Sequence, residues 1–356
     1  MSGIHSPIDV GVLGGTGMVG QQFVRFLQGH PWFRLTWIGA SERSAGKQYS
    51  EATAWRLDGE MPEAVRELTI SEARPQGGAP RLVFSAMDAN VASEIEQEFA
   101  RAGHVVVSNS RNHRMESDVP LLIPEVNPDH LKIIPHQQRE RGWTGMIVTN
   151  PNCSTIVLAM ALAPLRKFGI QRVMASTMQA ISGAGYPGVA SIDVNANVIP
   201  FISGEEEKMQ QETQKILGNF VASPRPALHS LNASVSASCH RVPVVDGHTI
   251  AVSVELRDQP SLEQVGAALR DFRGLPQQRR LPSAPPNPLI TMQHNDRPQP
   301  RRDANRENGM AVFVGRIRPC PVLTVKFVAL GHNTIRGAAG AAVLNAELMM
   351  SEGLLD

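Results

Sequence analysis

The sequence contains only three cysteines, Cys153, Cys239 and Cys320, and no CxxC motif. Neither a disulfide framework nor a thiolate zinc site is therefore indicated, and no metal centre is expected. No stretch approaches eighteen consecutive apolar residues, so no membrane-spanning helix is predicted. The N-terminus lacks the basic, apolar and small-residue pattern of a signal peptide, which makes the cytoplasm the expected location.

Charge of either sign is not in excess, since the formal net charge is only +1. The chain therefore has no general field that would attract nucleic acid or an anionic membrane, and any anion must be recognised locally. A hydrophobic content of 42% with 19% charged residues is typical of a folded globular protein. The length of 356 residues exceeds what one core usually supports and favours two domains.

A glycine-rich turn follows the first predicted strand, residues 8–13, and leads into a predicted helix over 21–27. Gly14, Gly17 and Gly20 have GxxGxxG spacing. Glycines at such a turn let the backbone approach a pyrophosphate, which the helix N-terminus then binds. The pattern favours a dinucleotide site over a plain glycine turn.

The second predicted strand, residues 35–40, ends at Ser41-Glu42-Arg43-Ser44. An acidic residue at this position usually binds the adenosine ribose, whereas arginine and hydroxyl groups accept a 2′-phosphate. Ser41, Arg43 and Ser44 therefore favour NADP, although Glu42 is ambiguous and Arg43 could be a solvated loop charge.

Strand patterns at 82–86, 105–109 and 146–149, with a helical pattern at 91–102, predict a parallel sheet of the Rossmann type. Ligands bind such sheets at the carboxyl ends of the strands. Ser85 stands at one such end, where it either contacts a cofactor or packs.

Cys153 stands where the strand at 146–149 gives way to an apolar helix at 156–162. Asn152 and Ser154 are helix-start residues. A thiol at a helix N-terminus feels the positive end of the helix dipole, so the position favours a reactive thiolate over a core cysteine.

Two histidines are candidate bases for this thiol. Asp246-Gly247 predicts a hairpin between strands at 241–245 and 248–256, with His248 opening the return strand, and His240 is its rival. Arg111 or Arg114, in the polar loop after residue 109, could hold an anion in bidentate fashion or remain solvated.

The remaining patterns are less specific. Gln179 could orient a carbonyl, and three glutamates open a helix at 204–217, where acidic residues suit the dipole without any ligand. The Pro- and Arg-rich residues 273–308 predict a long surface excursion. Strands at 311–317 and 322–330 and a helix at 337–350 follow.

Seven motifs in order resemble the aspartate-β-semialdehyde dehydrogenases of the archaeal and fungal branch: GGTGMVG, SNSRNHR, NPNCST, MQAISGAG, GEEEK, RVPVVDGH and GHNTIRGAAG. The similarity runs from Val12 to the last helix. It implies an α/β fold with a Rossmann-type NADP-binding domain at 1–150 and a mixed α/β catalytic and dimerisation domain at 151–332. It also implies that a C-terminal helix at 333–356 returns to the first domain.

The resemblance also implies roles for individual residues. Cys153 corresponds to the nucleophile, His248 to the acid/base, and Asn152 and Gln179 to neighbours of the reacting carbonyl. The residues that correspond to substrate-binding groups are Arg241 for the carboxylate, Glu205 for the amine, and Arg114 and Lys208 for the phosphate. Those that correspond to cofactor contacts are Gly14, Thr16, Gly17, Met18, Val19, Ser41, Arg43, Ser44, Ser85, Ser182, Gly183 and Asn333. Because Glu205, Glu206 and Glu207 are consecutive, the amine ligand could be displaced by one.

The implied reaction is the NADPH-dependent reductive dephosphorylation of L-aspartyl 4-phosphate to L-aspartate 4-semialdehyde through a Cys153 thioester, in the biosynthesis of lysine, threonine and methionine. The implied partners are this substrate, phosphate and further copies of the chain, as a homodimer or homotetramer. A malonyl-CoA reductase is an alternative that needs no amine-binding Glu205. N-acetylglutamyl-phosphate and glyceraldehyde-phosphate dehydrogenases fit the NPNCST and GEEEK motifs less well. A catalytically silent NADP-binding protein would have no need for intact Cys153 and His248.

Overall fold

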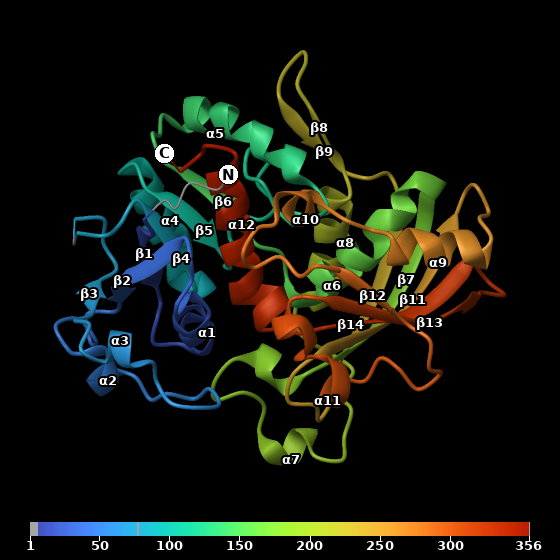
Figure 1. Ribbon diagram of the computed structural model, residues 1–356, viewed down its shortest axis with the longest axis horizontal. Coiled ribbons are helices and arrows are strands. Elements are labelled where there is room, and N and C mark those ends of the chain that lie inside the picture. The colour runs from blue at the N-terminus through green and yellow to red at the C-terminus, as the bar shows by residue number, and fades with distance from the viewer. Residues whose placement is uncertain (1–5, 77, 356) are drawn as a thin grey trace.

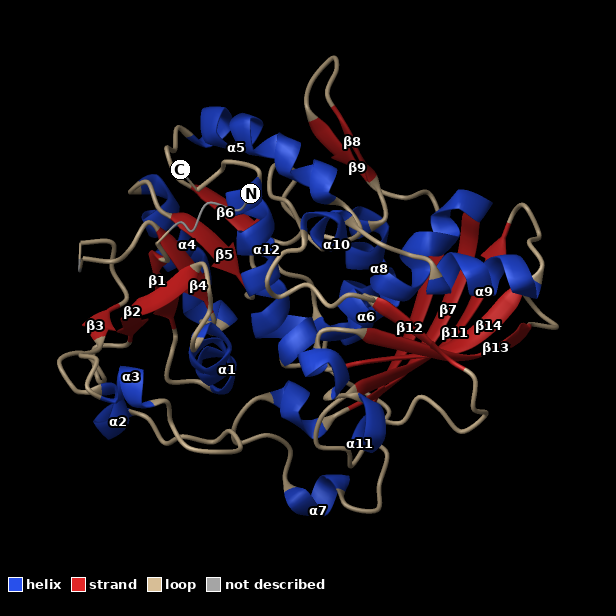
Figure 2. Ribbon diagram, in the orientation of Figure 1, coloured by secondary structure: helices blue, strands red, loops and turns tan. Residues whose placement is uncertain are grey.

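The computed structural model describes residues 6–76 and 78–355, which form two six-stranded sheets with their helices (Figures 1 and 2). The first sheet has the order β3-β2-β1-β4-β5-β6 and all its strands are parallel. Its strands are β1 (Ile8–Leu13), β2 (Phe33–Ala40), β3 (Ser71–Glu72), β4 (Leu82–Ser85), β5 (Val105–Ser108) and β6 (Met146–Thr149). Every residue of β4, β5 and β6 is buried, as expected for a parallel sheet covered on both faces.

The helices of this first half include α1 (Met18–Leu27) and α4 (Ala89–Arg101), which follow β1 and β4 as crossover connections. The others are α2 (Tyr49–Ala52), α3 (Glu63–Arg66), η1 (Pro128–Ile133) and α5 (Ile134–Arg141). The predicted Rossmann-type arrangement is therefore confirmed, and the glycine turn lies between β1 and α1 as the motif requires.

The second sheet is mixed and has the order β10-β7-β11-β14-β13-β12. Its strands are β7 (Ile170–Gln179), β10 (Ser234–Arg241), β11 (His248–Leu256), β12 (Leu289–Met292), β13 (Val312–Pro319) and β14 (Val325–Gly331). One face packs against α6 (Cys153–Leu162), α8 (Glu205–Ile216) and α9 (Leu262–Arg270) in one hydrophobic cluster. On β7, Val173 and Ala175 join that cluster, whereas Met174 and Met178 are exposed on the other face.

The predicted hairpin at Asp246-Gly247 is wrong. β10 runs parallel to β7 and β11 runs antiparallel to it, so β7 lies between the two expected hairpin partners. The intervening residues bond to the segment after β7, where Ile181 N–H donates to Val244 O at 2.8 Å. The Asp-Gly pair does turn the chain, with Gly247 at φ +97°. The turn, however, lies at the end of the connection that takes the chain from β10 past β7 to β11.

The Pro- and Arg-rich segment is also more ordered than predicted. It contains α10 (Leu275–Arg279), α11 (Pro300–Asp303) and the edge strand β12, which pairs in parallel with β13. Smaller elements are η2 (Ala163–Phe168), η3 (Ile181–Ala184), α7 (Ser191–Val194), η4 (Arg306–Gly309) and the projecting hairpin of β8 (Asn219–Val221) and β9 (Ala227–His229) at the top of Figure 1. Within residues 6–76 and 78–355, no helix is long and apolar enough to cross a bilayer.

After β14 the chain enters η5 (Ile335–Ala339), a π-helical turn, and then α12 (Gly340–Ser351), which lies between the two sheets (Figure 1). α12 is buried over almost its whole length and packs into the core of the first sheet. A Cβ atom on Gly337 would lie 2.7 Å from that of Cys153, so glycine is needed where η5 meets α6.

η5 is fixed by an ion pair that is fully buried. Arg336 donates from Nη1 and Nη2 to the two carboxylate oxygens of Glu125, at 2.9 and 2.7 Å, and both side chains are 0% exposed. Removing one partner of such a pair leaves an uncompensated buried charge.

We expect Arg336→Ala to lower the free energy of unfolding by about 3–5 kcal/mol because Glu125 would lose its countercharge. Arg172→Ala serves as a matched control, because Arg172 pairs with Glu255 at the surface and such pairs contribute about 1 kcal/mol or less. Urea denaturation of both variants measures the difference. Equal losses would mean that burial of the Arg336 pair does not determine its importance.

Candidate active site

The structure brings the predicted nucleophile and one of the two candidate histidines together. Cys153 is the first residue of α6, and its Sγ lies 3.1 Å from His248 Nε2 at the start of β11. The helix begins here because Asn152 Oδ1 accepts the backbone N–H groups of Ser154 and Thr155, at 2.9 and 3.2 Å. His240, the rival base, instead places Nδ1 3.0 Å from the carbonyl of Thr177.

The tautomer of His248 is set by its second ring nitrogen. The backbone N–H of Ala180 donates to Nδ1 at 3.1 Å, so Nδ1 is an acceptor and the proton of the neutral ring is assigned to Nε2, facing the sulfur. Burial, with the charges of Arg241 and His332, lowers the pKa of His248 to about 3. The ring is therefore neutral at physiological pH and presents an N–H to Cys153.

The thiolate favoured by the helix start is not the resting state of Cys153. Burial, with the charge of Glu205, raises the pKa of the thiol to about 12. The charges of Arg114 and Arg241 and the N–H of Ser154 act in the opposite direction without outweighing it. The resting pair is thus a neutral thiol beside a neutral imidazole.

The first turn of α8 resolves which of the three glutamates faces the nucleophile. Glu205 is buried, accepts from Asn152 Nδ2 at 2.8 Å and lies 3.3 Å from Lys208 Nζ. Glu206 instead accepts the backbone N–H of Cys239, and Glu207 is exposed. Only Glu205 therefore presents its carboxylate to the site.

Arg241 and Gln179 close the other side of the site, at the ends of β10 and β7. Arg241 is buried and donates from Nη1 to Ala180 O at 2.7 Å. Gln179 is also buried, and its amide donates to Thr177 Oγ1 at 3.3 Å. A Cβ atom on Gly183 would lie 2.9 Å from Arg241 Nη1 and 3.1 Å from His248 Cε1, so this loop approaches the site closely.

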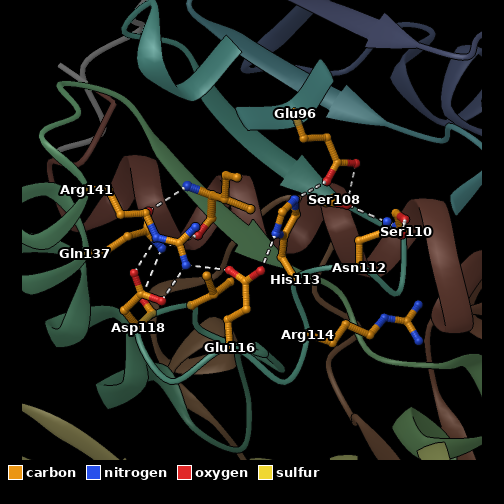
Figure 3. Close-up of polar contacts among 12 residues, drawn as sticks. Glu96, Ser108, Ser110, Asn112, His113, Arg114, Glu116, Asp118, Gln137 and Arg141 are labelled. Carbon is orange, nitrogen blue, oxygen red and sulfur yellow. Dashed lines mark hydrogen bonds and ion pairs between the residues drawn. The ribbon is translucent and has the colours of Figure 1, made fainter. Parts of the chain in front are cut away.

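The loop that carries Arg114 is fixed by a buried polar network (Figure 3). His113 is fully buried, with Nδ1 2.8 Å from Glu116 Oε1 and Nε2 3.6 Å from Glu96 Oε2. Burial alone would lower the pKa of His113, but Glu116 and Glu96 together raise it. Arg141 binds Glu116 and Asp118 in turn. The next residue, Arg114, is thereby held inside the molecule, whereas Arg111 is exposed.

Sequence reasoning missed the direct partner of Arg114. Glu212 on α8 is 2% exposed and accepts from Arg114 Nη1 at 2.9 Å. No motif contains it, but positions 205, 208 and 212 share one face of a helix. The helical spacing from Glu205 and Lys208 could therefore have pointed to this residue.

The glycine turn has the shape that a pyrophosphate requires. Gly14 has φ +75°, and a Cβ atom on Gly20 would overlap the carbonyl oxygen of Gly14, so both glycines are needed for the turn. Gly17 is the N-cap of α1 and offers no side-chain acceptor, and within the described part of the chain a Cβ there would meet Gly14 O alone, at 3.6 Å. Because the first N–H groups of a helix have no acceptor within the helix, those of Met18 and Val19 are the candidates for binding phosphate. Thr16 completes the turn, and its carbonyl accepts from Gln21.

The two ends of the predicted cofactor site differ in character. Beyond β2, Ser41, Arg43 and Ser44 form a turn in which the guanidinium is exposed, and Glu42 lies 3.8 Å from Arg74. At the opposite end, Asn333 donates to Ser182 Oγ at 2.8 Å and accepts the N–H of Gly247 at 2.8 Å.

Ser85 is the predicted cofactor contact that the geometry favours least. The residue is fully buried at the end of β4, and its hydroxyl lies in the cluster around Glu96, whose pKa it helps to hold down against burial. Its position favours the packing alternative for the side chain.

Comparison with known proteins matches both halves of the chain. Residues 9–134 match the family model of the semialdehyde dehydrogenase NAD binding domain, and residues 162–336 match that of the semialdehyde dehydrogenase dimerisation domain. The chain is 49% identical to an aspartate-semialdehyde dehydrogenase of Archaeoglobus fulgidus over 98% of its own length and 99% of the relative's. It is 48% identical to that of Cryptococcus neoformans, over 98% of both chains.

The fold comparison agrees. The crystal structure of aspartate semialdehyde dehydrogenase with NADP from Candida albicans superposes with a TM-score of 0.91 at 41% identity, over 98% of this chain and all of that one. Two matching family models, near-complete coverage and a shared fold lead to one conclusion: the chain belongs to the aspartate-semialdehyde dehydrogenase family.

Proposed function

We propose that the chain catalyses the NADPH-dependent reductive dephosphorylation of L-aspartyl 4-phosphate to L-aspartate 4-semialdehyde, a step of amino-acid biosynthesis that leads to lysine, threonine and methionine. The single observation that carries the proposal is the 3.1 Å contact between Cys153 Sγ and His248 Nε2, inside a ring of buried charged side chains. A cysteine beside an imidazole is the usual arrangement for acyl transfer through a covalent intermediate.

Cys153 would form the covalent intermediate. Its sulfur attacks the acyl carbon, a C–S bond forms, and the C–O bond to phosphate breaks with its electron pair on the phosphate oxygen. The thiol proton leaves with the phosphate, and a thioester results. When bound, NADPH supplies the hydride that reduces this acyl group. Release of the aldehyde breaks the C–S bond and returns the electron pair to sulfur. His248 Nε2–H faces this thiolate and stabilises it by a hydrogen bond until the sulfur takes a proton from solvent.

Activation of the thiol must accompany substrate binding. At a pKa of about 12 the free thiol is a weak nucleophile near neutral pH. Arg114 and Arg241 already act to lower that pKa, and the N–H of His248 can donate a hydrogen bond to the developing thiolate. His248 therefore acts as a hydrogen-bond donor to the sulfur, a role that its assigned tautomer favours over that of a base.

The charges around Cys153 match those of the substrate. Arg241 would bind the carboxylate, Glu205 the amine, and Arg114 with Lys208 the phosphate. Asn152 and Gln179 would stand beside the reacting carbonyl. The buried carboxylate of Glu205 supports an amine-bearing substrate over a malonyl-CoA type of substrate, which offers nothing for it to bind.

The cofactor is NADP. The open N-terminus of α1 fits a pyrophosphate, and Ser41, Arg43 and Ser44 supply two hydroxyl groups and an exposed guanidinium for a 2′-phosphate. Asn333, Ser182 and Gly183 would bind near the nicotinamide end. The NADP complex of the Candida albicans relative supports the same cofactor here.

The exposed face of the second sheet supports self-association. Met174 is 55% and Met178 is 37% exposed on this face of β7. Large apolar side chains gathered on one surface are typical of a protein interface. We propose that two copies of the chain pair through this face as at least a homodimer.

Activity should depend on phosphate and on Cys153. The purified chain should reduce NADP⁺ with aspartate semialdehyde only when inorganic phosphate is present. Cys153→Ala should abolish this activity while the affinity for NADPH, measured by fluorescence titration, stays nearly intact. The hydrogen bond of the sulfur runs to His248, whereas the phosphates of the cofactor are expected at the glycine turn. Cys320→Ala, which removes a cysteine outside the site, should retain activity. Substantial phosphate-dependent turnover by Cys153→Ala would remove the nucleophile assignment.

Arg43→Ala should weaken NADPH binding much more than NADH binding. Loss of one charge-assisted contact to the 2′-phosphate corresponds to about tenfold in affinity, and NADH has no such phosphate. Titration of both dinucleotides against wild type and variant measures the ratio. Equal weakening of the two would count against a 2′-phosphate contact at Arg43.

Sedimentation should show an assembly at least twice the 38.6 kDa mass of one chain. Met174→Asp should shift the protein towards monomer, because it would bury an unpaired charge in the interface. Val322→Asp, at an exposed turn between β13 and β14, is the control and should not change the mass. Wild type sedimenting as a monomer would contradict the proposal.

A further inference from the structure

Glu212 joins the two segments that meet at the candidate reaction centre. Its Oε1 accepts from Arg114 Nη1 at 2.9 Å, and its Oε2 accepts the backbone N–H of Asn152 at 2.7 Å. The side chain is 2% exposed, so these two bonds use both oxygens of a carboxylate that has left water. A buried carboxylate is costly unless it is paired, and the hydrogen bonds of this one run to Arg114 and to the residue before the nucleophile.

Arg114 is held at further points by α8 and by its own loop. Its Nη2 donates to Asn109 O at 2.7 Å. Lys215, three residues after Glu212 on α8, donates to the carbonyl oxygens of Arg114, Glu116 and Val119 at 2.7, 2.7 and 2.8 Å. α8 therefore fixes the side chain of Arg114 through Glu212 and its main chain through Lys215.

The Arg114 guanidinium also has an N–H group that is not used in these contacts. Its Nε is buried, and among the residues that the structure describes it has no hydrogen-bond partner. Five N–H groups belong to a guanidinium, so fixing two of them leaves donors in a defined plane for an incoming anion. Figure 3 shows the Arg114 side chain extending away from the His113 network that fixes its backbone.

We propose that Glu212 is a positioning residue of the reaction: it orients the Arg114 guanidinium for phosphate and fixes the Asn152 peptide immediately before Cys153. The inference rests on the proposed function, in which Arg114 binds phosphate. An arginine that is already oriented loses less side-chain freedom when phosphate binds, so Glu212 strengthens phosphate binding although it carries a negative charge itself.

The chemistry of the site requires a carboxylate at this position. An amide of the same size has one oxygen and one NH₂ group, so it could accept from either Arg114 or Asn152 but would turn a donor towards the other. Glu212→Gln thus preserves the volume of the side chain and breaks one of its two bonds.

The test measures KM values in the oxidative direction, with inorganic phosphate, aspartate semialdehyde and NADP⁺ varied in turn. Glu212→Gln should raise the KM for phosphate by about tenfold or more and leave the KM for NADP⁺ within about twofold. A lower content of folded enzyme reduces the maximal rate without changing KM, so a merely structural role predicts no change in the KM for phosphate. Glu207→Gln, the same substitution at an exposed site on α8, should match wild type.

A double-mutant cycle shows whether Glu212 acts through Arg114. The KM for phosphate of Arg114→Ala with Glu212→Gln should equal that of Arg114→Ala alone. Independent, multiplying effects would overturn the inference, and so would a fall in KM for Glu212→Gln, which would show that its charge opposes phosphate.

Failure at other levels is distinguishable. A wild-type enzyme without phosphate dependence would refute the proposed function. An unchanged KM for phosphate in Arg114→Ala would refute the role of that arginine. A raised KM in Arg114→Ala with none in Glu212→Gln would refute only the role of Glu212.

Discussion

The hydrogen bonds of Asn152 hold the site together, because this residue joins the start of α6 to two buried glutamates of α8. Its Oδ1 caps α6, its Nδ2 donates to Glu205, and its backbone N–H donates to Glu212. Asn152 therefore couples three features of the site: the cap of α6, the position of the nucleophile and the positions of the two glutamates. α8 carries both carboxylates on one face, so its register against α6 sets where the charges lie around Cys153.

Burial is the larger influence on the reacting pair, and it acts on both members in the same sense. It raises the pKa of the Cys153 thiol to about 12 and lowers the pKa of His248 to about 3, so each group is neutral before substrate binds. The bond from Ala180 N–H to Nδ1 reinforces this state because an imidazolium would need that nitrogen as a donor. The helix start and the two arginines favour thiolate, but they oppose a desolvation cost that is larger.

Local patterns predicted the parts of the fold that depend on neighbouring residues. The strand, glycine turn and helix around Gly14, and the placement of Cys153 at the start of α6, follow from periodicity and helix-start chemistry. The pairing of β11 did not follow, because Asp246-Gly247 reports only that the chain turns. The strand that pairs with β11 here is β7, some seventy residues earlier in the chain, and the two strands bury Val173 and Val252 on a shared face.

The buried charged residues are a second feature that local sequence patterns do not predict. Glutamate and arginine are usually surface residues, so a sequence gives no reason to expect them inside. Yet Glu125 and Arg336 form a fully buried pair although they are 211 positions apart, and Glu212 binds Arg114 although they are 98 positions apart. Each such charge destabilises the fold unless its partner arrives with good geometry, so sites of this kind are specified by the tertiary structure as a whole. Motifs could identify Arg114 because the resemblance covers its loop. They could not identify the residue that orients it, because Glu212 owes its position to the packing of α8 against α6.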